Sequence, residues 1–137
     1  MRLLKTYIVE ASAVIREDLI ATLEELASVT VVGSAEDEES ALQWLSDGRH
    51  AADLVIVDIF LRAGTGLGVL RAMGSRRNRR TKLVVLSNFA TPDMRRHCLE
   101  LGADAVFDMS KDIDALMLYC RGLAGELPSD ALAAPQA

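Results

Sequence analysis

Four positions along the chain lie at or just beyond the ends of short apolar runs of the kind that form buried β-strands. They hold Glu10, Asp58, Ser87 and Met109. In an open parallel α/β sheet, ligands bind beyond the carboxyl ends of the strands, so these positions are the first to consider for chemistry. If the strands before Glu10 and Asp58 are neighbours, two carboxylates lie side by side and repel each other unless a cation lies between them. A hard divalent ion such as Mg²⁺ suits such oxygen ligands, which predicts a metal site at this edge.

The elements that must position these residues alternate regularly along the chain. Strand-like runs at 7–9, 29–32, 53–58, 83–86 and 105–107 are separated by helical patterns, and a last helix is expected over 113–123. The run 54–57 is continuously apolar, as expected for a strand covered on both faces of a parallel sheet. Five β–α units in 137 residues predict one α/β domain. The expected architecture is a doubly wound, flavodoxin-like, five-stranded parallel sheet in the order 2-1-3-4-5.

Several finer expectations follow from the local patterns. The first helix is expected to bury a stripe made by Val14, Leu19, Leu23 and Leu26. The second strand is expected to end at Gly33, and Thr91 with Pro92 to begin the fourth helix. The glycines at 64, 66 and 68 are interpreted as a turn and a loosely packed helix start. The domain is expected to span 1–124, followed by a loose tail over 125–137.

Composition excludes several classes of protein. The net charge of −5 argues against a dedicated nucleic-acid binder. No apolar run is long enough to cross a bilayer and no signal peptide is evident, so a cytoplasmic location is expected. Cys98 and Cys120 form no disulfide framework and are interpreted as small core residues. One basic run, Arg76–Lys82 with Arg71 before it, is either a solvated loop or a docking patch for an acidic partner or a nucleotide.

With these elements in place, the chain resembles the receiver (CheY-like) domain of bacterial two-component response regulators. The resemblance covers about residues 4–124 and is carried by Ile8–Glu10, the buried strand ending in Asp58, Gly64–Leu67, Leu86–Ser87 and Leu101–Asp104. It implies a signalling domain rather than an enzyme, with a sensor histidine kinase or a phosphotransfer protein as the phosphodonor. It also implies that Asp58 is the phosphoacceptor, that Glu10, Asp58 and the main-chain carbonyl of Phe60 hold Mg²⁺, and that the Ser87 hydroxyl contacts the phosphoryl group.

Three positions depart from the family pattern. Ala11 stands where a second acidic residue contacts the metal, and Met109 stands where a lysine pairs with the phosphoryl group. Lys111 lies two residues further on and reaches back only if the loop is rearranged. Val106 replaces the aromatic residue that reports the state of the site. These departures predict an atypical receiver with weak Mg²⁺ binding.

No effector domain is expected after residue 124, so output is expected through a downstream protein or a homodimer. The resemblance places that contact on the face made by the fourth helix, the fifth strand and the fifth helix. The candidate contact residues are Arg95, Arg96, Asp112, Asp114 and Tyr119. An arginine of one copy is expected to pair with an aspartate of its neighbour, and the contact to depend only weakly on a phosphodonor because Val106 is not aromatic.

Two other functions fit the same architecture. One is a pseudo-receiver, in which the fold binds a partner without a phosphate switch. The other is a small flavin- or nucleotide-binding protein. The second is disfavoured because the segment after the first strand, residues 10–13, contains no glycine-rich phosphate loop.

Overall fold

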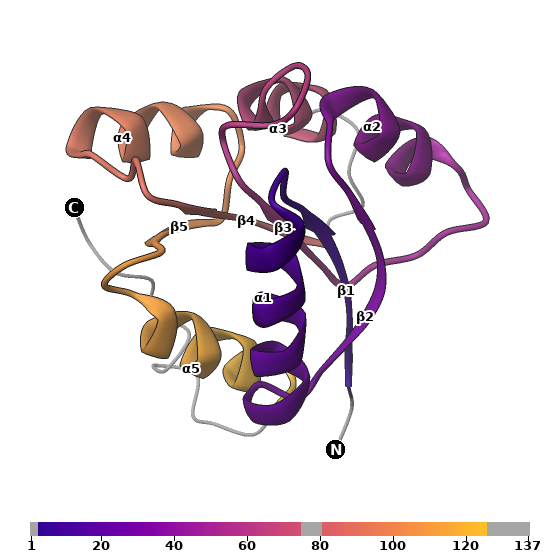
Figure 1. Ribbon diagram of the computed structural model, residues 1–137, viewed down its shortest axis with the longest axis vertical. Helices are drawn as coiled ribbons and strands as arrows, with labels where there is room; N and C mark the ends of the chain where they lie inside the picture. Colours follow the sequence, from indigo (N-terminus) through magenta and orange to yellow (C-terminus); the bar gives the residue numbers. More distant parts are fainter. Residues whose placement is uncertain (1–2, 75–80, 126–137) are drawn as a thin grey trace.

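The structure is a computed structural model that describes residues 3–74 and 81–125. Strands and helices alternate throughout this part of the chain (Figure 1). The strands are β1 (Leu4–Val9), β2 (Val29–Ala35), β3 (Leu54–Val57), β4 (Lys82–Ser87) and β5 (Ala105–Asp108). The helices are α1 (Ala13–Leu26), α2 (Glu38–Ser46), α3 (Gly66–Gly74), α4 (Pro92–Glu100) and α5 (Ile113–Leu123).

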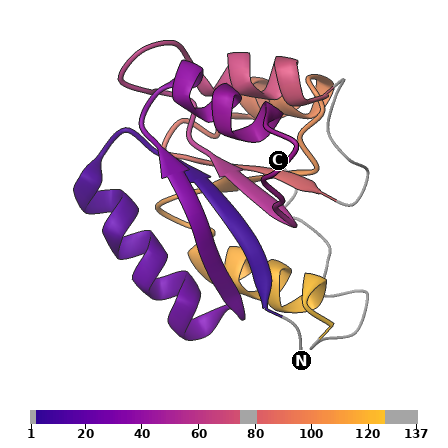
Figure 2. The same cartoon turned by 90° about the vertical axis from the view of Figure 1, so that its right-hand side faces the viewer.

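The five strands form one parallel sheet in the order β2-β1-β3-β4-β5, which confirms the predicted fold class. The helices α1 and α5 cover one face, and α2, α3 and α4 cover the other (Figures 1 and 2). This arrangement places the chain turns after β1, β3, β4 and β5 at one edge of the sheet. Glu10, Asp58, Ser87 and Met109 therefore lie at the same edge, as the sequence predicts.

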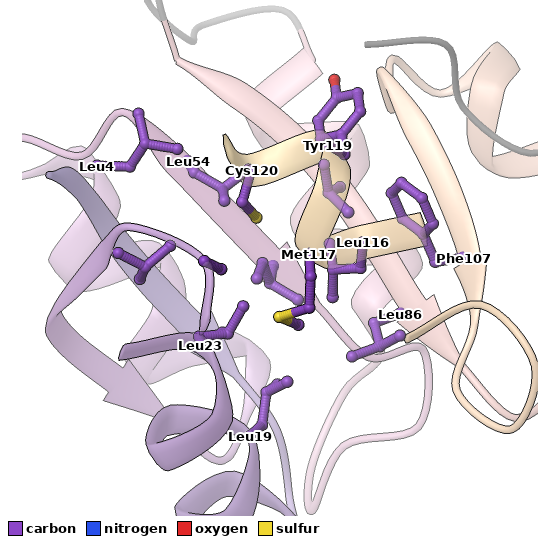
Figure 3. Close-up of a cluster of buried hydrophobic side chains, with 14 of the residues drawn as sticks. Leu4, Leu19, Leu23, Leu54, Leu86, Phe107, Leu116, Met117, Tyr119 and Cys120 are labelled. Carbon is purple, nitrogen blue, oxygen red and sulfur yellow. The ribbon is translucent and has the colours of Figure 1, made fainter. Parts of the chain in front are cut away.

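The sheet separates two apolar cores, and β3 contributes to both. Leu54 and Ile56 pack toward α1 and α5, whereas Val55 and Val57 pack toward the other three helices. Figure 3 shows the first of these cores, in which side chains of α5 meet the sheet. Because alternate residues of a strand point to opposite faces, a continuously apolar strand is what a doubly covered sheet requires. Both cysteines are buried and free, in agreement with their interpretation as core residues.

The second strand is longer than predicted, because β2 continues through Gly33 to Ala35. The pairing of β1 with β2 shifts register between Thr6 and Tyr7. A Cβ atom at Gly33 would lie 2.9 Å from Cε1 of Tyr7, whose ring stacks on Trp44. The glycine at 33 therefore makes room for an aromatic ring within the strand and does not end it.

The first helix buries a narrower stripe than predicted. Leu19 and Leu23 lie in the core, but Val14 is 69% exposed and Leu26 is 56% exposed. Ser12 caps this helix, because its Oγ accepts a hydrogen bond from the Ile15 N–H at 3.2 Å. The stripe is narrower because Val14 and Leu26 lie in the first and last turns of the helix, and the prediction for these two residues was wrong.

Other predicted boundaries agree with the structure. Thr91 is the N-cap of α4 with Pro92 in its first turn, and α5 spans the predicted residues. None of the helices in the described part of the chain is long and apolar enough to span a membrane. The predicted tail beyond residue 125 and most of the basic run, residues 76–80, lie outside the described residues.

Candidate phosphoacceptor site

Glu10 and Asp58 occupy matching places on two neighbouring strands. The β1–β3 pairing aligns Val9 with Val57, and the Asp58 N–H continues it by donating to the Val9 carbonyl at 2.9 Å. The Glu10 N–H in turn donates to the Ala35 carbonyl of β2 at 2.9 Å. The carboxyl group of Asp58 acts on that of Glu10 across the two strand ends and raises its pKa, after the larger effect of burial. The topology thus brings together two acids that lie far apart in the sequence.

Glu10 is almost fully buried, with 4% of its surface exposed, whereas Asp58 is half-buried. The pKa of Glu10 is raised to about 7, mainly because burial disfavours its charged form. The hydrogen bond from the Ser12 N–H opposes this shift, and the charge of Asp58 adds to it. The Ser12 N–H donates to Oε2 of Glu10 at 2.8 Å, and the Ile59 N–H donates to Oδ1 of Asp58 at 2.7 Å. Backbone N–H groups therefore orient both carboxylates. With a pKa of about 7, Glu10 gains or loses its proton near neutral pH.

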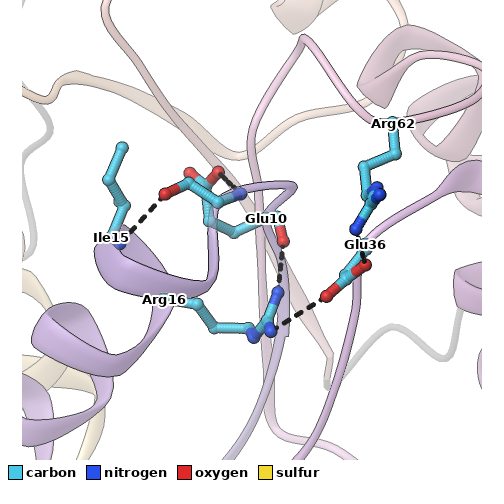
Figure 4. Close-up of polar contacts among 6 residues, drawn as sticks. Glu10, Ile15, Arg16, Glu36 and Arg62 are labelled. Atoms are coloured by element: carbon cyan, nitrogen blue, oxygen red, sulfur yellow. Dashed lines mark hydrogen bonds and ion pairs between the residues drawn. The ribbon is translucent and has the colours of Figure 1, made fainter.

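A second layer of charged side chains fixes the loop that carries Glu10 (Figure 4). The Arg16 guanidinium donates to the Glu10 carbonyl at 2.8 Å and to Glu36 at 3.1 Å. Arg62, from the loop after β3, donates to the other oxygen of Glu36 at 3.0 Å. Both arginines lower the pKa of Glu36, Arg62 more strongly. Glu36 thereby links the loops that follow β1, β2 and β3 around the acid pair.

The glycines after Asp58 are a close-packed junction, so their interpretation as a loosely packed helix start was wrong. A Cβ atom at Gly66 would lie 2.0 Å from the Asp58 carbonyl oxygen. At Gly68 a Cβ atom would meet the Glu38 carboxyl group at 2.4 Å, and Oε1 of Glu38 accepts a hydrogen bond from the Thr65 N–H. Glycine at 66 lets α3 approach the backbone of Asp58, and glycine at 68 leaves space for the Glu38 side chain.

Ser87 ends β4 and is fully buried, on the strand beside that of Asp58. Its Oγ accepts a hydrogen bond from the Phe89 N–H at 3.1 Å. The Phe89 ring packs edge-to-face against Phe60, with 4.6 Å between ring centroids, although both rings are more than half exposed. An aromatic contact thus joins the loop after β3, which carries Asp58, to the loop after β4, which follows Ser87. The Phe60–Phe89 contact was not predicted, since nothing in the sequence relates the two residues.

At β5 the structure shows an apolar side chain where the family pattern has a cation. Met109 packs against the core on the α1 and α5 face, and its N–H donates to the Ser87 carbonyl at 3.0 Å. Lys111 is exposed and its N–H donates to the Asp108 carbonyl at 3.3 Å. The hydrogen bonds from Ser110 lower the pKa of Asp108, and the charge of Lys111 adds to this effect. The role of Lys111 at the site therefore stays a prediction.

The candidate contact residues of α4 and α5 do not all lie at the surface. Tyr119 is 6% exposed and packs edge-to-face against Phe107 in the core. Arg95 pairs with Asp112 of the same chain at 3.1 Å, and Arg96 pairs with Asp93 one turn away. Arg95 and Asp112 are thus partners within the chain, and the expected pairing of Arg95 or Arg96 with Asp112 or Asp114 of a neighbour stays a prediction. Arg96 and Asp114 are exposed.

The donor set suits a hard cation but is small. Mg²⁺ prefers oxygen ligands, and the carboxylates of Glu10 and Asp58 with the Phe60 carbonyl are all oxygen donors. Within residues 3–74 and 81–125, no group of three or more His, Cys, Asp and Glu side chains could hold a metal ion. Ala11 contributes no carboxylate to the set. These donors fit Mg²⁺ in chemical type, with only two charged groups to bind it.

The chain is thus a doubly wound α/β domain with two carboxylates and a buried hydroxyl at the carboxyl ends of its strands. A family model described as the response regulator receiver domain matches residues 6–119. The chain belongs to this family. No curated protein sequence matches it closely.

Solved structures with the same fold have low sequence identity to this chain. The Francisella response regulator 1452 receiver domain is 19% identical with a TM-score of 0.76, over 89% of this chain and 97% of that one. A DNA-binding response regulator of the LuxR family from Staphylococcus aureus is 18% identical with a TM-score of 0.73, over 84% and 93%. RcsB from Salmonella enterica serovar Typhimurium, bound to promoter rprA in the presence of phosphomimetic BeF3-, is 18% identical with a TM-score of 0.76, over 96% and 64%. The chain thus spans less than two thirds of that RcsB chain.

Proposed function

We propose that this receiver domain accepts a phosphoryl group on Asp58 and passes the signal on through contact with another protein. The observation that carries the proposal is the acid pair. Asp58 follows a fully buried strand, lies beside the buried Glu10 at the end of the neighbouring strand, and is one strand away from the buried Ser87 hydroxyl. The phosphodonor is a sensor histidine kinase or a phosphotransfer protein.

In this mechanism, an Asp58 carboxylate oxygen attacks the phosphorus atom of the donor. A new bond joins that oxygen to phosphorus, and the bond from phosphorus to the donor breaks, leaving an acyl phosphate. The Ile59 N–H, which donates to Oδ1 of Asp58 at 2.7 Å, holds the carboxylate in one orientation for the attack. Glu10 must be ionised to assist, because only its charged carboxylate can help to hold a cation beside the attacking oxygen.

Glu10, Asp58 and the Phe60 carbonyl would hold Mg²⁺, which when bound neutralises charge on the transferring phosphoryl group. The Ser87 hydroxyl can donate its proton to a phosphoryl oxygen, since in the structure its oxygen acts as the acceptor for Phe89. Met109 supplies no cation to this group. The proposed acyl phosphate is therefore stabilised by fewer charges than the family pattern provides.

Two residues favour a second candidate, a pseudo-receiver that binds a partner without phosphorylation. Ala11 removes one metal ligand, and Met109 packs into the core in place of the phosphoryl-pairing cation. In both candidates the output is protein contact. The exposed part of the α4-β5-α5 face available for it includes Arg96, Asp114 and Leu118, the last of which is 47% exposed.

Incubation with acetyl phosphate and Mg²⁺, followed by intact mass measurement, separates the two candidates. We expect a mass gain of one phosphoryl group that is lost in Asp58→Asn. Asp53→Asn is the matched control, because Asp53 lies at the opposite end of β3 and accepts a hydrogen bond from the Lys5 N–H. An adduct that persists in Asp58→Asn contradicts the assignment, and no adduct in the unmodified protein favours the pseudo-receiver.

A further inference from the structure

One guanidinium group joins all the elements of the α4-β5-α5 face. Arg95 of α4 donates through Nε to the Ala90 carbonyl at 3.1 Å, through Nη1 to the Val106 carbonyl at 2.8 Å, and through Nη2 to Oδ2 of Asp112 at 3.1 Å. Its side chain is only 12% exposed. The adjacent Arg96 is 66% exposed and pairs within its own helix. Arg95 is thus an internal crosslink, whereas its neighbour is a surface residue.

Asp112 is turned toward this crosslink rather than toward its own helix. It occupies the N-cap position of α5 but makes no side-chain capping hydrogen bond. Its Oδ2 instead accepts hydrogen bonds from the Asp108 N–H at 2.8 Å and from Arg95. Aspartate at an N-cap ordinarily accepts from a backbone N–H of the first helical turn. The carboxylate therefore joins the end of β5 and the start of α5 to α4.

The same guanidinium is connected to the buried hydroxyl at the phosphoacceptor edge. Ser87 Oγ accepts from the Phe89 N–H, and the carbonyl of the next residue, Ala90, accepts from Arg95. The short loop after β4 is thus held at one end by Ser87 and at the other by Arg95. If the hydroxyl turns away from Phe89, the restraint on that end of the loop is lost and the Ala90 carbonyl is free to shift against the guanidinium.

We propose that Arg95 is the positioning residue that couples the Ser87 hydroxyl to the α4-β5-α5 face in this chain. Val106, at the position of the state-reporting aromatic, contributes its carbonyl rather than its side chain to the link. The planar fork of arginine can serve three acceptors at once, which the single ammonium of lysine cannot do with the same geometry. In its signalling role the proposal rests on the proposed function, because phosphorylation is what would turn the hydroxyl.

Amide hydrogen exchange in the full chain tests the coupling without any phosphodonor. The reporter is the Asp108 amide, which donates to Asp112. We expect Ser87→Ala, which frees the Phe89 N–H, to change exchange at Asp108 at least about fivefold, the lower end of typical coupling between sites. In an Arg95→Met background the same change should fall below about twofold, and in the matched Arg96→Met background it should persist in full.

Arg95→Lys keeps the charge and serves as a second variant if Arg95→Met does not fold; it should also lose the response. The proposal is overturned if Ser87→Ala leaves Asp108 unchanged in the parent protein, or changes it equally with and without Arg95. It is also overturned if Arg96→Met removes the response.

A second arm separates this inference from the proposed function. Beryllofluoride with Mg²⁺, a phosphoryl analogue, is added to the parent protein and to Arg95→Met. A response at Phe89 in both proteins, and at Asp108 in the parent alone, supports both proposals. No response to beryllofluoride, together with an Arg95-dependent response to Ser87→Ala, supports the coupling and contradicts the phosphoacceptor role. If beryllofluoride changes exchange at Asp108 equally in the parent protein and in Arg95→Met, the coupling is overturned, but the phosphoacceptor role is still supported.

Discussion

Glu10 and Asp58 lie side by side at the ends of neighbouring strands, and burial together with the charge of Asp58 raises the pKa of Glu10 to about 7. Glu10 therefore gains or loses its proton near neutral pH, beside the group proposed to accept the phosphoryl group. Each change of pH, metal or side chain at this edge of the sheet therefore acts on both residues together.

This pairing predicts a specific dependence of stability on pH. The pKa of Glu10 is about 7 in the folded protein against an ordinary value of 4.5, so the folded state binds more protons than the unfolded state between these values. Glu10 therefore contributes fully to the free energy of unfolding at pH values below its ordinary pKa. This contribution is lost as the pH rises toward 7. We expect a loss on the order of 2–3 kcal/mol, measured by urea unfolding without metal.

Glu10→Gln should remove this pH dependence and make the protein more stable than the parent at pH values above about 7, where the parent must hold two adjacent charges. Glu17→Gln, at an exposed position of α1, is the matched control and should keep the parent's pH profile. A parent protein whose stability rises between pH 5 and 7 would contradict the raised pKa.

Restoring the second acid should strengthen metal binding. Ala11→Asp places a carboxylate beside Glu10, and a charge-assisted contact of this kind contributes roughly 1–3 kcal/mol, or about ten- to a hundredfold in affinity. We expect millimolar or weaker Mg²⁺ binding in the parent, measured by titration calorimetry, and tighter binding in the variant. Ala13→Asp, an exposed position at the start of α1, controls for added charge alone. Micromolar binding in the parent would show that the second carboxylate is not needed.

The junction between α3 and Asp58 should not tolerate a methyl group. Gly66→Ala places a Cβ atom 2.0 Å from the Asp58 carbonyl oxygen, and backbone atoms cannot move aside cheaply. We expect a loss of roughly 1–3 kcal/mol in stability, and slower modification of Asp58 because its backbone must shift. At Gly48 a Cβ atom would meet nothing within 4 Å, so Gly48→Ala should leave both stability and modification near those of the parent.

Substitutions at two adjacent residues of α5 should distinguish the loss of core packing from the loss of a surface contact. Tyr119→Ala removes a buried ring that packs on Phe107, and roughly 3–5 kcal/mol should be lost, as for other buried aromatic residues. Leu118→Ala, at a position 47% exposed, should change stability by less than about 1 kcal/mol. If this face carries the output contact, Leu118→Ala weakens association in sedimentation experiments while the fold persists. An association that is indifferent to Leu118→Ala and to Arg96→Glu would place the contact elsewhere.

The order of the elements and the position of the acid pair follow from local patterns in the sequence. A continuously apolar run such as Leu54–Val57 can be stable only in a strand covered on both faces, and Asp58 is the first polar residue after it. Thr91 with Pro92 and the apolar spacing of α5 define helix boundaries through nearest-neighbour chemistry, and both boundaries agree with the structure. Strand order then places Glu10 beside Asp58, since parallel strands end at one edge.

The partners of the residues that join distant segments were decided by tertiary structure alone. Sequence spacing does not reveal that Arg95 turns inward to Asp112, or that the Gly66 backbone lies against the Asp58 carbonyl. These contacts depend on which faces meet when the helices pack on the sheet. Adjacent residues of one helix, such as Arg95 and Arg96, differ by about 100° around the helix axis and therefore lie in different environments. Local chemistry therefore determined what each element is, whereas the packing of distant segments decided which side chains the site and the α4-β5-α5 face can use.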